Sequence, residues 1–181
     1  MTRIPQLTSR DQVPAEAWPI FDAIVASRGN VRGPFSVLMH SPEVAGRTAH
    51  LGTFVRFESS LPPLIRELTV MTAARESECA YEWGAHVAAA GEAGISDATV
   101  QAIKHRLPVD NLPVQDQALV RFARELVRDH KVSDATFVAV HGILGDGGIA
   151  ELTAAIGYYC LLACVLNAFE VPPLPGGDAL P

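Results

Sequence analysis

Four side chains that could do chemistry lie within eight consecutive residues: Cys79, Glu82, Trp83 and His86. At about 100° per residue, their spacing places all four within an arc of roughly 100° on one helix face. A thiol can act as a nucleophile, and a carboxylate or an imidazole can act as a general acid or base. The spacing therefore predicts a reactive helix face.

A further acidic residue, Glu67, lies on the preceding helix in the middle of an otherwise apolar stripe. Leu64, Leu68 and Met71 share its face. A buried carboxylate needs a partner, because burial removes its hydration. We expect Glu67 to share one apolar hollow with the reactive groups of the next helix, where carboxylates and an imidazole shift one another's affinity for protons.

These residues must be positioned by helices. The periodic segments all predict helix, and none shows the alternation or the β-branched clusters of a strand. The expected helices span residues 14–27, 42–61, 63–76, 79–90, a short stretch from 97, 114–130, 133–144 and 152–169, with a turn at 35–39 and a glycine-rich loop at 145–148. The predicted fold class is all-α, a helical bundle.

One domain is expected to cover residues 1–181. Residues 33–107 would form its core with the reactive motif, a linker with two prolines would follow at 107–113, and residues 114–181 would form the C-terminal helices. The tripeptide Glu67-Leu68-Thr69 recurs as Glu151-Leu152-Thr153, each time opening an apolar helix. This echo suggests an internal duplication, with the C-terminal helices as a pseudo-repeat.

The composition limits the kinds of partner that this protein can bind. The 181 residues include 14 basic and 20 acidic side chains, which gives a formal net charge of −6 and a pI near 5.4. This balance argues against partners such as nucleic acid or an anionic membrane, which bind clustered Lys and Arg. The N-terminal residues lack an apolar signal segment and the three cysteines are an odd number, so we expect a cytoplasmic protein without a disulfide framework.

The uncharged stretch Leu152–Phe169 has about the length that a bilayer requires. It contains Asn167 and is flanked by Glu151 and Glu170 rather than by Lys or Arg, which argues against a membrane span. A helix that is apolar on all sides and lies outside lipid is buried by protein. We therefore expect it to be buried between subunits of a homo-oligomer.

Three segments carry a resemblance to a known family: Arg66-Glu67-Leu68, Cys79-Ala80-Tyr81-Glu82-Trp83-Gly84-Ala85-His86 and Ala90-Gly91-Glu92-Ala93-Gly94-Ile95-Ser96. Together they resemble the carboxymuconolactone decarboxylase family, which includes 4-carboxymuconolactone decarboxylase and the alkyl hydroperoxidase D proteins. The resemblance covers about residues 60–105. It implies an all-helical fold of the alkyl hydroperoxidase D type that assembles into homotrimers or homohexamers.

The same residues distinguish two branches of the family. Glu67, Cys79 and His86 match the hydroperoxidase pattern, but Glu82 stands where that branch has the second cysteine of a C-x-x-C pair. Glu82, Trp83 and His86 match the Glu-Trp-x-x-His pattern of the decarboxylase branch. Because a carboxylate cannot resolve a sulfenic acid, the resemblance favours the decarboxylase-like branch.

The leading functional hypothesis is a cofactor-free lyase that acts on a small carboxylated or lactone compound. Loss of carbon dioxide leaves an electron pair on carbon, and that carbon needs a proton but no cofactor. We expect His86 to donate or shuttle this proton, Glu82 to be its partner or the acid, and Glu67 to be a base or to orient His86. The residues expected to contact substrate are His50, Trp83 and Tyr158.

Two other functions remain open. A hydroperoxide reductase could use Cys79 as its thiolate, and then Cys160 or Cys164 would have to supply the second thiol. The chain could also be a non-catalytic oligomeric helical protein.

The site residues also have plainer interpretations. Glu67 could form a structural ion pair with Arg56 or Arg75, and Cys79 and Trp83 could be core residues. A metal could bind Glu82 and His86 with Glu67 or Cys79 as third ligand, but no second His or Cys cluster accompanies them, so no metal is expected.

Overall fold

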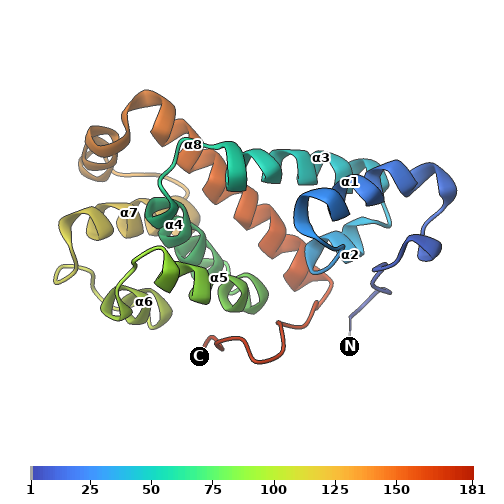
Figure 1. Cartoon of the computed structure of the whole chain (residues 1–181). Coiled ribbons are helices and arrows are strands. Elements are labelled where there is room, and N and C mark those ends of the chain that lie inside the picture. Colours follow the sequence, from blue (N-terminus) through green and yellow to red (C-terminus); the bar gives the residue numbers. More distant parts are fainter. Residues whose placement is uncertain (1) are drawn as a thin grey trace. The chain divides into compact units, whose positions relative to one another are not determined.

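The computed structural model describes residues 2–181, and helices are the only regular secondary structure in that range (Figure 1). The predicted all-α fold is therefore confirmed. The chain divides into two compact units. The first holds the described residues up to Ser59 together with residues 164–172, and the second holds residues 60–163 and 173–181. The expected single domain and its internal duplication stay predictions.

The first unit is built from three helices: α1 Trp18–Arg28, α2 Pro34–Leu38 and α3 Pro42–Thr53. Two short 3-10 turns precede α1, and a π-helical turn, Phe54–Glu58, follows α3. Residues 35–39, expected as a turn, lie mostly within α2, because Pro34 at its first position is preorganised for a helix. Helices α1 and α2 pack against α3, and their apolar faces form a separate core that includes Phe21, Ile24 and Phe35.

The second unit is organised around α4, Pro63–Glu76. The other helices of this unit are α5 Ala80–Glu92, α6 Asp97–Lys104, α7 Val114–Arg124 with a π-helical turn at Glu125–Asp129, and α8 Asp134–Ala168, which belongs to this unit up to residue 163. Helix α4 contacts α5, α6 and α7, and residues 67–75 are all buried. Glu67 and Arg75, the charged side chains on this part of α4, therefore need partners inside the protein.

The helix ends of this unit follow the local sequence. Pro63 occupies the first position of α4, where its missing N–H costs no hydrogen bond. Ser96 caps α6, and its hydroxyl accepts the backbone N–H of Thr99 at 3.2 Å. The segment 107–113, expected as a linker, lies inside the second unit and not between the units.

Helix α8 consists of two helices that meet at a kink, as the expected pair of helices around residues 145–148 predicts, but the break is narrower than the expected loop. Only Gly145 leaves the helical backbone, with φ 65° and ψ −175°, and the helix continues on both sides of it. Glycine adopts this positive φ without the steric cost that a Cβ would bring. The glycine-rich stretch is therefore a kink in a long helix. By length and composition alone α8 could cross a membrane, and half of its most apolar window is buried within the protein.

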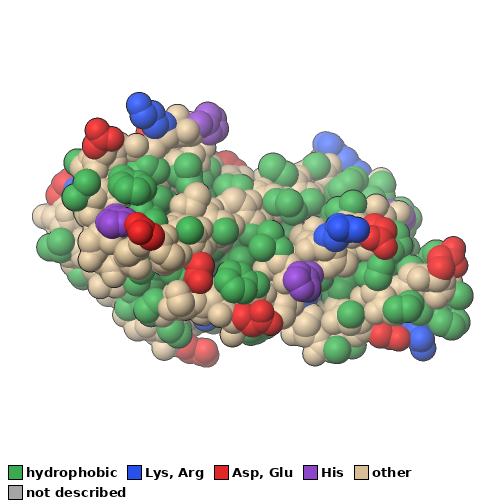
Figure 2. All heavy atoms as spheres, turned by 90° about the horizontal axis from the view of Figure 1, so that it is seen from above, with side chains coloured by type: hydrophobic (Ala, Val, Ile, Leu, Met, Phe, Trp, Pro, Cys, Tyr) green, Lys and Arg blue, Asp and Glu red, His purple; other side chains and the backbone are tan. Residues whose placement is uncertain are grey.

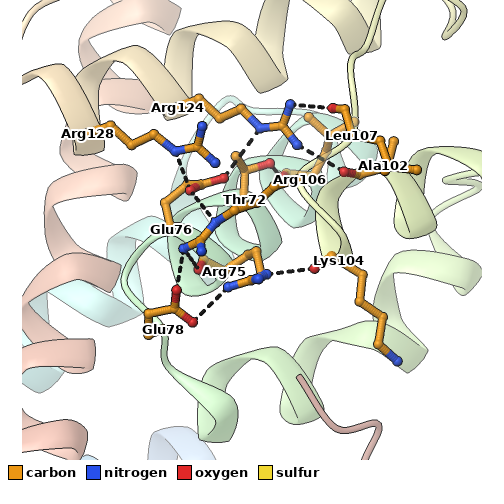
Figure 3. Close-up of polar contacts among 11 residues, drawn as sticks. Thr72, Arg75, Glu76, Glu78, Ala102, Lys104, Arg106, Leu107, Arg124 and Arg128 are labelled. Atoms are coloured by element: carbon orange, nitrogen blue, oxygen red, sulfur yellow. Dashed lines mark hydrogen bonds and ion pairs between the residues drawn. The ribbon is translucent and has the colours of Figure 1, made fainter. Parts of the chain in front are cut away.

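Charged side chains meet at the C-terminal end of α4 (Figure 3). The fully buried side chain of Glu76 forms ion pairs with Arg106 at 3.1 Å, Arg124 at 3.3 Å and Arg128 at 2.5 Å. Arg124 also donates to the carbonyls of Ala102 and Leu107. Burial lowers the pKa of Arg124, yet a guanidinium stays charged at any physiological pH. This Glu76 cluster joins α4 to α7 and to the segment that follows α6.

The surface combines apolar and charged groups. Figure 2 shows one face on which hydrophobic side chains are spread between isolated charged groups. Exposed large apolar side chains include Val114 on α7 and Phe137, Val138 and Ile143 on α8. Single exposed apolar residues are common, whereas several close together are typical of contact surfaces.

Candidate active site

The turn between α4 and α5 positions the start of the reactive helix. After the last residue of α4, Glu78 adopts a left-handed conformation with φ 52°. The N–H of Glu78 then bonds to the carbonyl of Arg75, and the N–H of Cys79 bonds to the carbonyl of Ala74 at 2.8 Å. This pattern of hydrogen bonds is a Schellman motif. It closes α4 and makes Cys79 the N-cap of α5.

Three of the four expected catalytic side chains form a buried cluster. The Nδ1 of His86 lies 2.7 Å from Oε2 of Glu67 on α4, and its Nε2 lies 3.5 Å from Oε2 of Glu82 on α5. All three residues are buried, with 5–8% of their surface exposed. The sequence prediction that Glu67, Glu82 and His86 lie close together is therefore met by their geometry.

The cluster changes the proton affinity of the imidazole. Burial alone would lower the pKa of His86, since desolvation disfavours its charged form. Hydrogen bonds that the ring donates to the carboxylates of Glu67 and Glu82, together with the negative charge of these groups, outweigh burial and raise the pKa of His86 from 6.5 to about 9. The ring is therefore an imidazolium at neutral pH, with one carboxylate facing each nitrogen.

Glu67 has one further ionic partner, the neighbouring Arg66, whose Nε lies 3.6 Å from Oε1 of Glu67. The suggested structural pairs of Glu67 with Arg56 or Arg75 are wrong. Arg75 pairs with Glu78 and donates to the carbonyl of Lys104, while the guanidinium of Arg56 lies over the ring of Phe57. Neither arginine is needed to neutralise Glu67, because His86 and Arg66 already do so.

The fourth expected catalytic residue, Cys79, is fully buried at the N-terminal end of α5. No disulfide joins it to Cys160 or Cys164. Among the described residues, no group of three His, Cys, Asp or Glu side chains is arranged to hold a metal ion. The described side chains at this place are an imidazolium, two carboxylates and a buried sulfur.

Trp83, expected to contact substrate, is fully buried and is bonded to the C-terminal segment. Its Nε1 donates to Asp178 at 3.1 Å, and Lys104 donates to the other oxygen of the same carboxylate at 2.6 Å. The hydrogen bond from Lys104 is the main reason why the pKa of Asp178 lies below its usual value. Gly84 lets the segment approach, since a Cβ there would lie 3.3 Å from the carbonyl oxygen of Asp178. Trp83 thus has a structural role in binding this segment.

The two other expected substrate contacts are also placed differently. His50 is exposed on α3 in the first unit. Tyr158 is buried and packs edge-on against Tyr159 with ring centroids 5.4 Å apart. Tyr159 contacts the cluster of Glu67, Glu82 and His86, because its ring meets the imidazole of His86 edge-on at 5.2 Å.

The sequence reasoning did not assign three residues that matter here: Arg66, Tyr159 and Asp178. Arg66 lies inside a motif segment and could have been noticed. Tyr159 differs from Tyr158 by one helical position, and only the packing of α8 shows which of the two faces His86. Asp178 lies in a segment without periodicity, so no sequence signal indicated its contact with Trp83.

The described residues thus form an all-helical fold with a buried Glu-His-Glu cluster on two packed helices. The model of the carboxymuconolactone decarboxylase family matches residues 42–125, which include Glu67, Cys79, Glu82 and His86. The resemblance found in the sequence is thereby confirmed over residues 42–125, which match the model of this family.

Solved structures support the fold. The AhpD core protein from Ralstonia eutropha, described as an uncharacterized peroxidase-related protein, has a TM-score of 0.75 at 18% identity, covering 96% of this chain and 93% of that one. The debrominase Bmp8 in complex with 2,3,4-tribromopyrrole has a TM-score of 0.75 at 15% identity, with coverage of 97% and 93%. A putative antioxidant defence protein AhpD from Agrobacterium tumefaciens has a TM-score of 0.67 at 18% identity, with coverage of 79% and 99%. No curated relative matches the sequence.

Proposed function

We propose that the protein is a lyase that releases carbon dioxide from a small carboxylated or lactone compound by general acid–base catalysis. The observation that carries this proposal is the imidazolium of His86 held between Glu67 and Glu82 inside the protein. Such a group stores a proton at neutral pH and can deliver it to a carbon atom. Membership of residues 42–125 in the carboxymuconolactone decarboxylase family agrees with this chemistry.

The two contacts of His86 suggest different tasks for its two nitrogens. The short 2.7 Å contact between Nδ1 and Glu67 fixes the orientation of the ring, as a carboxylate does for the histidine of a catalytic triad. The longer 3.5 Å contact between Nε2 and Glu82 leaves the second proton easier to transfer. We therefore assign proton donation to Nε2 of His86 and orientation of the ring to Glu67.

The proposed step balances without a cofactor. The bond between the carboxylate carbon and the adjacent carbon breaks, carbon dioxide leaves, and the electron pair remains on the adjacent carbon. That carbon then takes the proton from Nε2 of His86. Glu82 returns a proton from solvent to the ring, which restores the imidazolium.

The substrate class follows from the charges of the site. A carboxylated substrate is an anion, and Arg66 is a cation that already lies 3.6 Å from Glu67 with a partly exposed side chain. A guanidinium binds carboxylates well because its donors match their geometry. In this proposal Arg66 holds a carboxylate of the substrate beside His86.

The test compares two histidines that each face a carboxylate. His86→Gln should reduce the rate of carbon dioxide release from a panel of small carboxylated lactones at least about 100-fold, since general acid catalysis typically contributes that much. His141→Gln is the matched control, because His141 contacts Asp146 at the same 2.7 Å but lies exposed on α8. No release from any compound of the panel, or equal loss in both variants, would contradict the proposal.

Hydroperoxide reduction by Cys79 stays a second prediction. The names of two similar structures refer to AhpD. The complete burial of Cys79 and the presence of Glu82 in place of a second cysteine make the acid–base function the better supported of the two. The assembly into a homotrimer or homohexamer also stays a prediction, and the exposed apolar side chains of α8 are consistent with it.

A further inference from the structure

The C-terminal segment, residues 173–181, is attached to the second unit through one carboxylate. The two oxygens of Asp178 accept hydrogen bonds from different helices, one from Nε1 of Trp83 on α5 at 3.1 Å and the other from Nζ of Lys104 at the end of α6 at 2.6 Å. None of residues 173–181 is buried. A segment with so few buried contacts can open while the rest of the fold stays intact.

The two donors are held in place by the helices and not by the segment. Trp83 is fully buried, so its indole ring is fixed by the packing of α5. The main-chain carbonyl of Lys104 accepts a hydrogen bond from Nε of Arg75 on α4 at 2.6 Å, which ties the end of α6 to α4. When Asp178 leaves, an indole N–H and an ammonium group therefore remain within reach of one carboxylate, and a carboxylate of another molecule can accept both hydrogen bonds.

Glycines on both sides of this contact bring the two backbones close together. A Cβ on Gly84, the residue after Trp83, would lie 3.3 Å from the carbonyl oxygen of Asp178. A Cβ on Gly177, the residue before Asp178, would lie 3.4 Å from the Cα of Gly84. The site therefore fits an aspartate preceded by glycine, because a larger side chain in place of the glycine would push the segment away from α5.

This site is separate from the cluster of Glu67, Glu82 and His86. Gly84 lies two positions after Glu82 and two positions before His86, so at about 100° per residue it points roughly 160° away from each of them around α5. The C-terminal segment thus lies on the flank of α5 that faces away from the imidazolium.

We propose that Trp83, Lys104 and Gly84 form a binding site for an extended peptide that carries aspartate after glycine. The chain fills this site with its own Gly177 and Asp178, and the C-terminal segment acts as a releasable strap that a peptide of the same chemistry replaces. A ligand tethered by a short flexible linker has an effective concentration in the millimolar range. A free peptide therefore competes poorly with the wild-type strap and binds well once the tethered carboxylate is removed.

The first experiment adds a synthetic peptide with the sequence of residues 173–181 to the full chain and measures binding by calorimetry. Asp178→Asn removes the charge that holds the strap, so the peptide should bind this variant at least about 10-fold more tightly than wild type. The same peptide with asparagine in place of its aspartate should bind the variant at least about 10-fold more weakly. Glu170→Gln is the matched control, because Glu170 pairs with Arg3 at the same 2.6 Å, and this variant should bind the peptide as wild type does.

The second experiment uses the two lysines of the chain, Lys104 and Lys131. The side chain of Lys104 is 17% exposed and paired, whereas Lys131 is exposed and serves as the internal reference for acetylation by acetic anhydride. Gly84→Val places a branched side chain against the strap, so the ratio of acetylation at Lys104 to that at Lys131 should rise several-fold. Gly91→Val is the matched control on the same helix, since a Cβ on Gly91 meets no atom within 4 Å, and it should leave this ratio unchanged.

Two results would overturn the proposal. The first is equal affinity of the peptide for wild type and Asp178→Asn, or no binding to either. The second is the same acetylation ratio in Gly84→Val and Gly91→Val. Carbon dioxide release enters neither measurement, so the peptide site and the lyase can fail separately.

Discussion

Helix α4 carries two buried carboxylates, Glu67 and Glu76, that the protein neutralises in different ways. They are nine residues apart, which is two and a half turns, so they point to opposite sides of the helix. Glu76 is surrounded by three arginines, whereas Glu67 meets one histidine and, at 3.6 Å, one arginine. The side chain of Glu76 is completely buried, and that of Glu67 is 11% exposed.

The difference shows how a buried charge that only stabilises the fold can be told from one that can take part in proton transfer. A guanidinium cannot release its proton in a protein, so the charges around Glu76 are fixed and can only hold helices together. The imidazole of His86 can release its proton near pH 9, and a second carboxylate, Glu82, stands at its other nitrogen. One side of α4 therefore carries a permanent ion cluster, and the other carries a proton that can move.

The largest expected effect is on stability and comes from removing the carboxylate of Glu76. Glu76→Gln would leave Arg124 and Arg128 without their anion, while Arg106 keeps its ion pair with Glu78, and breaking a buried ion pair typically costs about 3–5 kcal/mol. For a chain of this size we expect the Tm to fall by roughly 10 °C. Thermal unfolding followed by circular dichroism measures this change.

Glu67→Gln is the matched variant on the opposite side of the same helix. An amide oxygen can still accept the hydrogen bond of Nδ1 of His86, so the expected loss is smaller, about 1–2 kcal/mol. If Glu67→Gln unfolded at a lower temperature than Glu76→Gln, the division between a structural and a chemical side of α4 would be wrong.

The second prediction is a pH dependence of stability. The pKa of His86 is raised from 6.5 to about 9 on folding, so the folded state holds its proton more tightly than the unfolded chain. The resulting stabilisation is complete below pH 6.5 and is lost as the pH rises from 6.5 through 9. Its size is of the order of 3 kcal/mol.

Denaturant unfolding at a series of pH values measures this effect as the difference between wild type and His86→Gln. That difference should shrink as the pH rises from 6.5 to 9. His141→Gln should keep the pH dependence of the wild type. A wild-type stability curve parallel to that of His86→Gln over this interval would show that the cluster does not hold the imidazolium.

The smallest expected effect is the difference between the contributions of Glu67 and Glu82 to the pKa of His86. Glu67→Gln and Glu82→Gln should each lower the pKa of His86 by roughly 1, because an opposite charge within a few ångströms favours the charged ring. The larger change is expected for Glu67→Gln, since its contact with the ring is shorter. Titration of the imidazole by NMR measures both. A larger change in Glu82→Gln would reverse the tasks assigned to Nδ1 and Nε2.

Much of the fold could be predicted from local signals. The expected helix at 63–76 coincides with α4, because Pro63 and the Schellman motif define its two ends. The expected break between two helices at 145–148 is present, but it is confined to Gly145, and the other three residues remain helical. Glycine lowers the stability of a helix by an amount that tertiary packing can offset. A glycine therefore indicates a break in a helix but does not require one.

The catalytic residues were predicted better than their surroundings. The spacing of Glu82 and His86 on one helix face follows from the period of the α-helix. The expected substrate contacts stay predictions, because they depend on how other segments pack. Trp83 is covered by a C-terminal segment bound through Asp178, and the ring of Tyr159 packs against His86.

The sequence by itself determined which side chains share a helix face and that a carboxylate would be buried on α4, since both follow from periodicity. Only the tertiary structure decided the partners: His86 for Glu67, three arginines for Glu76 and Ser77 for the sulfur of Cys160. The physical reason is that a buried charge requires a counter-charge but does not specify one. The choice is made by the helices that pack around it.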